Sequence, residues 1–160
     1  MCIRDRFSVG SVSRKEAIQA LHKAVQFFHS QVARNGGYLW QYSGDLKLRE
    51  AEGKVYDSRV WVQPPGTPTV GEAFLDAYEA TGEKLHLDAA LDAARALVKG
   101  QHRSGGWDYF VTFDPADRQP VRTNLDDDTT QSALRFLMRA DKVLKFEDER
   151  IHQAVMHGLD

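Results

Sequence analysis

Two neighbouring stretches of the sequence decide how the chain folds: residues 105–110 read GGWDYF and residues 124–137 read NLDDDTTQSALRFL. The second stretch places three consecutive carboxylates directly before apolar residues at helical spacing. Neighbouring like charges repel one another, so these carboxylates must be solvated or must face a cation, an arginine or a helix N-terminus. Asp128 and Gln131 match a capping box, which predicts that a helix begins at Asp128.

The remaining helix signals predict an all-α fold. Ser13 and Glu16 form a second capping box, and Pro68 suits the first turn of a helix. The expected helices are a first from Ser13 to Asn35, a second from Thr67 to Gly82, a third from about Asp88 to Lys99, a fourth from Asp128 and a fifth from about Asp148 to His157. Residues 60–62 (VWV) could form a short strand.

A Gly-Gly-aromatic motif occurs twice, ending at Tyr38 and at Trp107, an offset of 69 residues. Each copy follows one expected helix and precedes a long polar loop and another helix. Such a period predicts stacked or ringed helical hairpins, each with an apolar face that a neighbour must cover. We therefore expect this chain to be part of a larger assembly. The aromatic-rich loop 38–66 is too long for a plain connection and is expected to be functional or lid-like.

The composition is that of a globular protein and excludes two classes of partner. With 160 residues and a formal net charge of -2, the chain has no general attraction for nucleic acid or anionic lipid, and no apolar run is long enough to span a membrane. Residues 1–6 resemble a translated sequencing adapter, which leaves residues 7–160 as a single truncated domain. The only cysteine, Cys2, lies in that segment, so thiol chemistry is not expected.

The second half of the chain resembles the pectic acid lyases, pectate lyases built on an incomplete (α/α) toroid. That family has a GGWP motif after one helix and a YDNGATTTQIRFL motif that opens the next inner helix. Thr130 and residues 135–137 (RFL) match outright, and Asp126 falls on the family's aspartate. The departures are Asp108 for the proline, Leu125 for the tyrosine, Asp127 for the asparagine and Asp128 for the glycine.

The resemblance implies cleavage of an acidic polysaccharide, polygalacturonate, by calcium-assisted β-elimination. It places calcium and the substrate uronate on Asp126 and Asp127. The family's catalytic arginine lies further downstream, in an Arg-His-Ile-Thr-Phe-Asn-Asp-like segment that this sequence lacks, so no catalytic residue is expected within the chain. The resemblance also implies a secreted or periplasmic protein, and we expect a monomer at full length.

The residue chemistry is compatible with that activity. Calcium is a hard cation that takes six to eight oxygen ligands, and clustered aspartates supply them. A bound cation would neutralise the sugar carboxylate and so acidify the adjacent C5 proton, which a base must remove. Trp107 and Tyr109 could offer ring faces to sugars, and Arg122 could pair with a uronate.

Plainer interpretations stand beside each of these. Asp128 can serve only as a helix cap, Asp126 and Asp127 as ordinary loop acids, and Arg122 in a surface ion pair. Trp107 and Tyr38 can be packing wedges between hairpins. The histidines show no metal-binding spacing, and His22 and His29 are expected to be solvated.

Three other toroid functions remain open. Asp127-Asp128-Thr129 echoes the end of the Asp-x-Asp-Asp-Thr motif of terpene cyclases, although Leu125 occupies the place of its first aspartate. The others are a glycoside hydrolase or hydratase acting on uronides and a non-catalytic carbohydrate-binding toroid.

Overall fold

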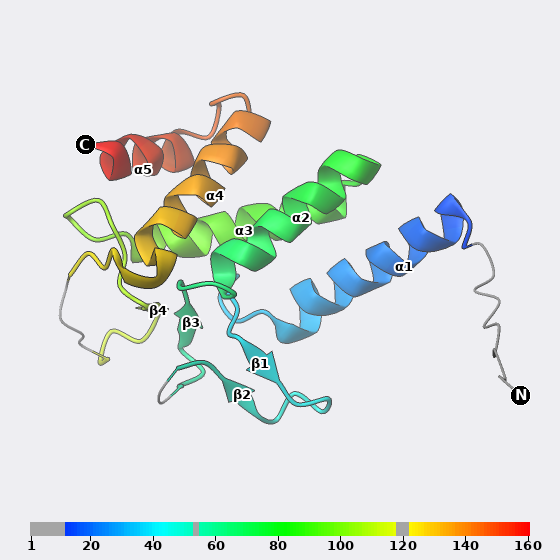
Figure 1. Ribbon diagram of the computed structural model, residues 1–160, viewed down its shortest axis with the longest axis horizontal. Coiled ribbons are helices and arrows are strands. Elements are labelled where there is room, and N and C mark those ends of the chain that lie inside the picture. The colour runs from blue at the N-terminus through cyan, green and yellow to red at the C-terminus, as the bar shows by residue number, and fades with distance from the viewer. Residues whose placement is uncertain (1–11, 53–54, 118–121) are drawn as a thin grey trace, which may run out of the picture.

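The computed structural model describes residues 12–52, 55–117 and 122–160, so the adapter-like residues 1–6 lie outside it. The all-α fold class is confirmed (Figure 1). The helices are α1 (Arg14–Phe27), α2 (Thr67–Thr81), α3 (Lys84–Gly100), α4 (Thr129–Val143) and α5 (Glu149–Leu159), with a π-helical turn at Phe28–Val32 and a 3₁₀ turn at Asp126–Asp128. The strands are β1 (Gln41–Tyr42), β2 (Arg49–Glu50), β3 (Arg59–Trp61) and β4 (Phe110–Thr112).

The antiparallel pair α2 and α3 forms the centre of the molecule. α4 packs against both of these helices, and α5 packs against α3 and α4 (Figure 1). The core consists largely of alanine, leucine and valine, with Tyr38, Phe74, Trp107 and Phe136 as its aromatic members. α1 lies to one side, and Val25 is its only buried residue. No described helix combines the length and the apolar character needed to cross a lipid bilayer.

Local sequence patterns predicted most helix ends correctly. The Ser13–Glu16 capping box is present, and Gly82 ends α2 in the left-handed conformation. α3 begins at Lys84, four residues before the predicted Asp88, because its N-cap residue Glu83 makes no side-chain cap bond and so leaves no signal in the sequence. α5 begins after Asp148, whose carboxylate accepts two backbone N–H groups of its first turn.

The Gly-Gly-aromatic motif is a repeat in structure as well as in sequence. The Tyr38 N–H donates to the Thr67 hydroxyl at 3.0 Å, and that hydroxyl donates back to the Tyr38 carbonyl at 3.3 Å. Trp107 makes the same pair of bonds with Thr130, both at 3.1 Å. Each copy thus uses a first-turn threonine of the next helix to hold a fully buried aromatic residue.

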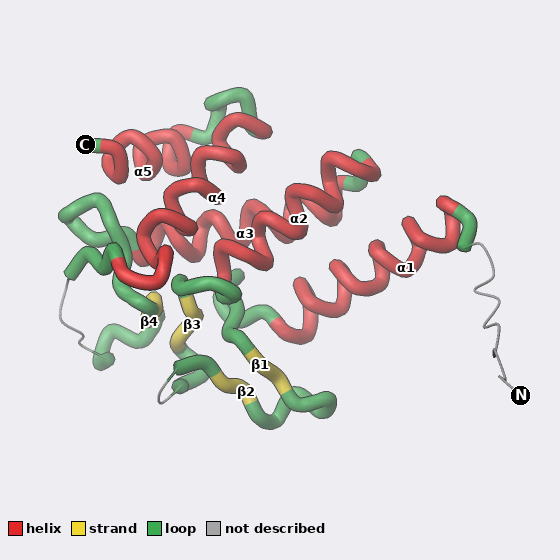
Figure 2. Tube along the Cα trace, in the orientation of Figure 1, coloured by secondary structure: helices red, strands yellow, loops and turns green. Residues whose placement is uncertain are grey.

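The two long loops meet at one end of the helices. β3 pairs with β4 in antiparallel register with Val60 opposite Val111, so the predicted strand exists one residue earlier than expected. β1 and β2 form a second small sheet, and Figure 2 shows all four strands gathered at the same end of the molecule. Val60, Trp61 and Val62 are buried, so this part of the 38–66 loop belongs to the folded body rather than to a lid.

Candidate functional site

The three aspartates before α4 adopt an unusual backbone. Asp127 has φ 49° and Asp128 has φ 61°, so two consecutive non-glycine residues lie in the left-handed region. Asparagine and glycine tolerate that region best. The pectic acid lyase motif has asparagine and glycine at these two positions, so the backbone shape fits the resemblance although the residues differ. Such strained residues concentrate at functional sites.

Asp128 does not cap α4, which corrects the sequence prediction. It occupies the N-cap position, but its side chain accepts no backbone N–H there because its left-handed backbone differs from the extended conformation of a cap. Its carboxylate instead binds both terminal nitrogens of Arg135, one of them at 2.9 Å. Those hydrogen bonds hold the pKa of Asp128 below its usual value. A terpene-cyclase acid must carry a proton, so this pairing opposes the cyclase interpretation at Asp128.

Asp126 and Asp127 remain available to a ligand. The Asp127 N–H donates to Oδ1 of Asp126 at 3.0 Å, and the Gln63 amide donates to Oδ2 of Asp127 at 3.1 Å. Within the described part of the chain, no protein group donates to Oδ2 of Asp126 or Oδ1 of Asp127. Both residues are exposed. These oxygens suit a hard cation such as calcium, but two carboxylates supply only part of the six to eight ligands that calcium takes.

Gln63 connects Asp127 to a cluster of aromatic rings. Oε1 of Gln63 accepts the Trp61 indole N–H at 3.3 Å, and its carbonyl accepts the Trp40 indole N–H at 3.1 Å. The Trp61 ring stacks on Tyr109, with centroids 6.5 Å apart and planes 15° from parallel. Tyr109 is partly exposed, so its ring is accessible to a ligand. Sequence reasoning missed Gln63, because its partner Asp127 is distant in the chain.

Trp107 does not face the solvent, which corrects its prediction as a sugar-binding ring. Its side chain is fully buried, and its indole N–H donates to the Leu97 carbonyl in α3 at 2.8 Å. The plainer interpretation, a packing wedge between hairpins, describes it.

Two arginines form ion pairs in the segments around β3 and β4. Arg122 is exposed, and its Nε lies 3.4 Å from Oδ2 of Asp108, so it forms a surface ion pair and can still reach a ligand. Arg59, which the sequence did not single out, is buried and donates to both carboxylate oxygens of Asp117 at 2.6 and 2.8 Å. These hydrogen bonds raise the pKa of Arg59. This ion pair links strand β3 to the segment that follows strand β4.

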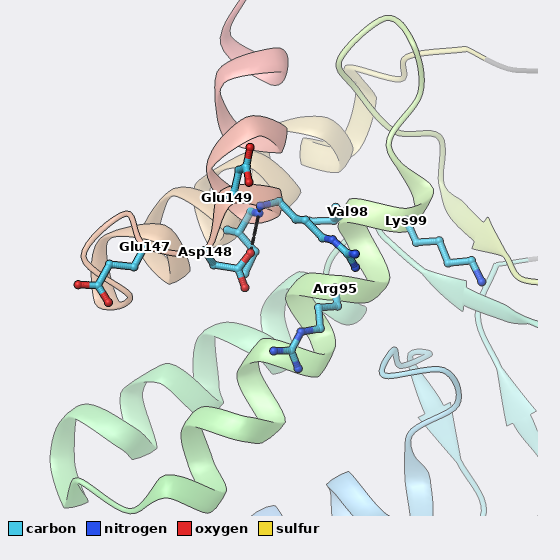
Figure 3. A pocket seen from close by; sticks show the side chains of 8 residues that line it. Arg95, Val98, Lys99, Glu147, Asp148 and Glu149 are labelled. Carbon is cyan, nitrogen blue, oxygen red and sulfur yellow. Dashed lines mark hydrogen bonds between the residues drawn. The ribbon is translucent and has the colours of Figure 1, made fainter.

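Two cavities of the described region are lined by residues other than Asp126, Asp127 and Tyr109. One of about 820 Å³ lies between α3 and the start of α5, and Figure 3 shows Arg95 of α3 and Asp148 and Glu149 of the α5 end among its lining residues. The Asp148 carboxylate already accepts backbone N–H groups as the N-cap of α5, and no predicted site residue lines this cavity. Another of about 460 Å³ runs along β4 and includes His102 and Asp108. Burial lowers the pKa of His102, and the negative charge of Asp108 partly opposes that effect.

No known family profile matches the sequence, and no curated protein matches it. Solved structures do resemble the fold. A family 10 polysaccharide lyase from Cellvibrio cellulosa has a TM-score of 0.59 and 18% identity, over 90% of this chain and 46% of its own. A mutant of that lyase in complex with trigalacturonic acid gives a TM-score of 0.52 and 18% identity, over 89% and 49% of the two chains. The chain therefore has a fold like that of a polysaccharide lyase and spans about half the length of these structures.

Proposed function

We propose that this chain is the part of a pectate-lyase-like protein that binds acidic polysaccharide through calcium. The fold similarity to a polysaccharide lyase over 90% of the chain carries this proposal. The complex of the related structure with trigalacturonic acid supports polygalacturonate as the substrate class. A secreted or periplasmic location is part of the same proposal.

The proposed binding face combines loops from both repeats. Asp126 and Asp127 would hold calcium together with water and a substrate carboxylate, and the ion would neutralise that carboxylate. Gln63 orients Asp127, because the amide occupies one of its oxygens and leaves the other free. Tyr109 offers a partly exposed ring, and Arg122 offers an exposed cation to a neighbouring uronate.

The proposed role of this chain is binding rather than complete catalysis. Asp126 matches the aspartate of the family's binding motif and Asp127 stands where that motif has asparagine, whereas the family's arginine-containing catalytic segment has no counterpart in this sequence. β-Elimination needs a base at the C5 proton in addition to a neutralised carboxylate. We therefore expect little or no absorbance from unsaturated product when the chain alone is incubated with polygalacturonate.

Titration calorimetry with trigalacturonic acid, with calcium and with a chelator, tests the proposal. We expect calcium-dependent binding that weakens about tenfold or more in Asp126→Ala and Asp127→Ala, because each substitution removes a proposed calcium ligand. Glu147→Ala is the matched control, because it removes an exposed acid beyond the opposite end of α4. Equal binding with and without calcium, or equal affinity in all three variants, would refute the proposed site.

A further inference from the structure

A second group of potential metal ligands lies where α1 meets the start of α3, away from the aspartate site. It consists of His22 from α1, Glu83 from the α2–α3 connection and His86 from α3. Each offers one ligand atom, and these three atoms lie within 4.8 Å of one another. Among the described residues, no other group of three histidine, cysteine or acidic side chains meets that spacing.

The hydrogen bonds around His86 fix which ring nitrogen carries the proton. The Thr81 hydroxyl donates to the Ala77 carbonyl at 2.7 Å, so its oxygen must accept at its other contacts. Nδ1 of His86 lies 2.8 Å from that oxygen and therefore carries the hydrogen. A neutral His86 then presents a lone pair at Nε2.

That lone pair has no hydrogen-bond partner although the side chain is completely buried. Nε2 of His86 lies 3.7 Å from Oε2 of Glu83, so two electron-rich atoms face each other. The same Glu83 oxygen makes a close contact with Nδ1 of His22. A cation among these atoms would satisfy all three ligands at once.

The donor set indicates the type of cation. Two imidazole nitrogens and one carboxylate are ligands typical of zinc, whereas calcium takes oxygen ligands. Ligand atoms around a tetrahedral zinc ion lie roughly 3.4 Å apart, from bond lengths of about 2.0–2.2 Å. The separation of 3.7 Å between His86 and Glu83 is close to that value. His22 lies closer to the same Glu83 oxygen than two ligands of one zinc ion do, so its partly exposed ring would move outward to bind the ion. Thr81 supplies the outer hydrogen bond that zinc-binding histidines usually make.

We propose that His22, Glu83 and His86 form a site for a zinc-type divalent ion, with solvent as the fourth ligand. Solvent can reach the site because the side chains of His22 and Glu83 are 43% and 33% exposed. An ion there would link α1 to α3. α1 otherwise contributes only one buried residue, so the ion would stabilise the attachment of this helix.

Zinc titration of the untagged chain tests this proposal, with Cys2→Ser introduced to remove a competing thiol. We expect one zinc ion per chain, an increase in thermal stability with zinc, and no competition from calcium. His22→Gln and Glu83→Gln should each weaken zinc binding by about tenfold or more. Both side chains are partly exposed, so both variants should fold, and circular dichroism would verify this. His86→Gln can be added to the set of variants if circular dichroism shows that it folds.

His29→Gln is the matched control. His29 also lies on the α1 side of the molecule and contacts a carboxylate of α3, with Nε2 2.9 Å from Oδ2 of Asp92, but no third ligand accompanies that pair. Its zinc affinity should equal that of the parent chain. Absence of zinc uptake, unchanged affinity in His22→Gln and Glu83→Gln, or an equal loss in His29→Gln would overturn the proposal. Each of these outcomes is independent of calcium binding at Asp126 and Asp127.

Discussion

Replacement of Thr130 by valine is expected to destabilise the fold through a single hydrogen-bonding group. The Thr130 hydroxyl is the partner of the Trp107 N–H, whereas the Trp107 carbonyl also accepts the Asn124 N–H at 2.8 Å. Valine keeps the shape but leaves the N–H unpaired in the core, which costs about 1–3 kcal/mol. With a urea m-value of about 2 kcal/mol/M, the midpoint of unfolding should fall by roughly 0.5–1.5 M.

The neighbouring Thr129 provides a matched control. It is also fully buried, but its hydroxyl has no hydrogen-bond partner. Thr129→Val therefore removes an unsatisfied polar atom and should be neutral or stabilising by up to about 1 kcal/mol. Thr67→Val removes the equivalent bond to Tyr38 and should match Thr130→Val. Equal urea midpoints for Thr129→Val and Thr130→Val would refute this account of the repeat.

Two further predictions concern the backbone and the ion pair at the start of α4. Gly105→Ala should lower the free energy of unfolding by about 2 kcal/mol or more, because φ is +82° and the new Cβ would lie 2.3 Å from a carbonyl oxygen of α5. Gly44→Ala, which meets open space, should not change the thermal midpoint, and equal effects would contradict the steric argument. The depressed pKa of Asp128 means that its pairing with Arg135 stabilises the fold above the unfolded carboxyl pKa and is lost as pH falls through the folded value. Because both side chains are well exposed, Arg135→Gln should cost only about 0–1 kcal/mol at pH 7 and nothing once Asp128 is protonated. A loss that persists in acid, measured by urea unfolding across pH, would show a different role for Arg135.

The sequence predicted local structure better than side-chain roles. The cap at Ser13, the start of the fifth helix near Asp148 and the end of α2 at Gly82 depend on residues a few positions apart, and these predictions were correct. The predicted helix cap at Asp128 was wrong, because Arg135, seven residues away, binds the Asp128 carboxylate instead. The same residue types permit both arrangements, and the left-handed backbone favours the ion pair.

The candidate site was only partly predictable from the sequence. The acidic positions before α4 stood out as a charge cluster, and Tyr109, which the sequence also singled out, is partly exposed. Gln63 and Arg59 did not stand out, because their partners Asp127 and Asp117 are distant in sequence. The prediction that Trp107 binds sugar was wrong, because its sequence context cannot distinguish a buried ring from an exposed one.

The sequence by itself determined the all-α class, most helix limits and the double Gly-Gly-aromatic motif. These properties depend on short-range backbone conformation, capping and periodicity, which neighbouring residues set. Only the tertiary structure decided which acids keep free oxygens, which aromatic ring is buried, and that His22 meets Glu83 and His86. Those outcomes depend on long-range packing and on competition for hydrogen-bond partners, which neither composition nor spacing records.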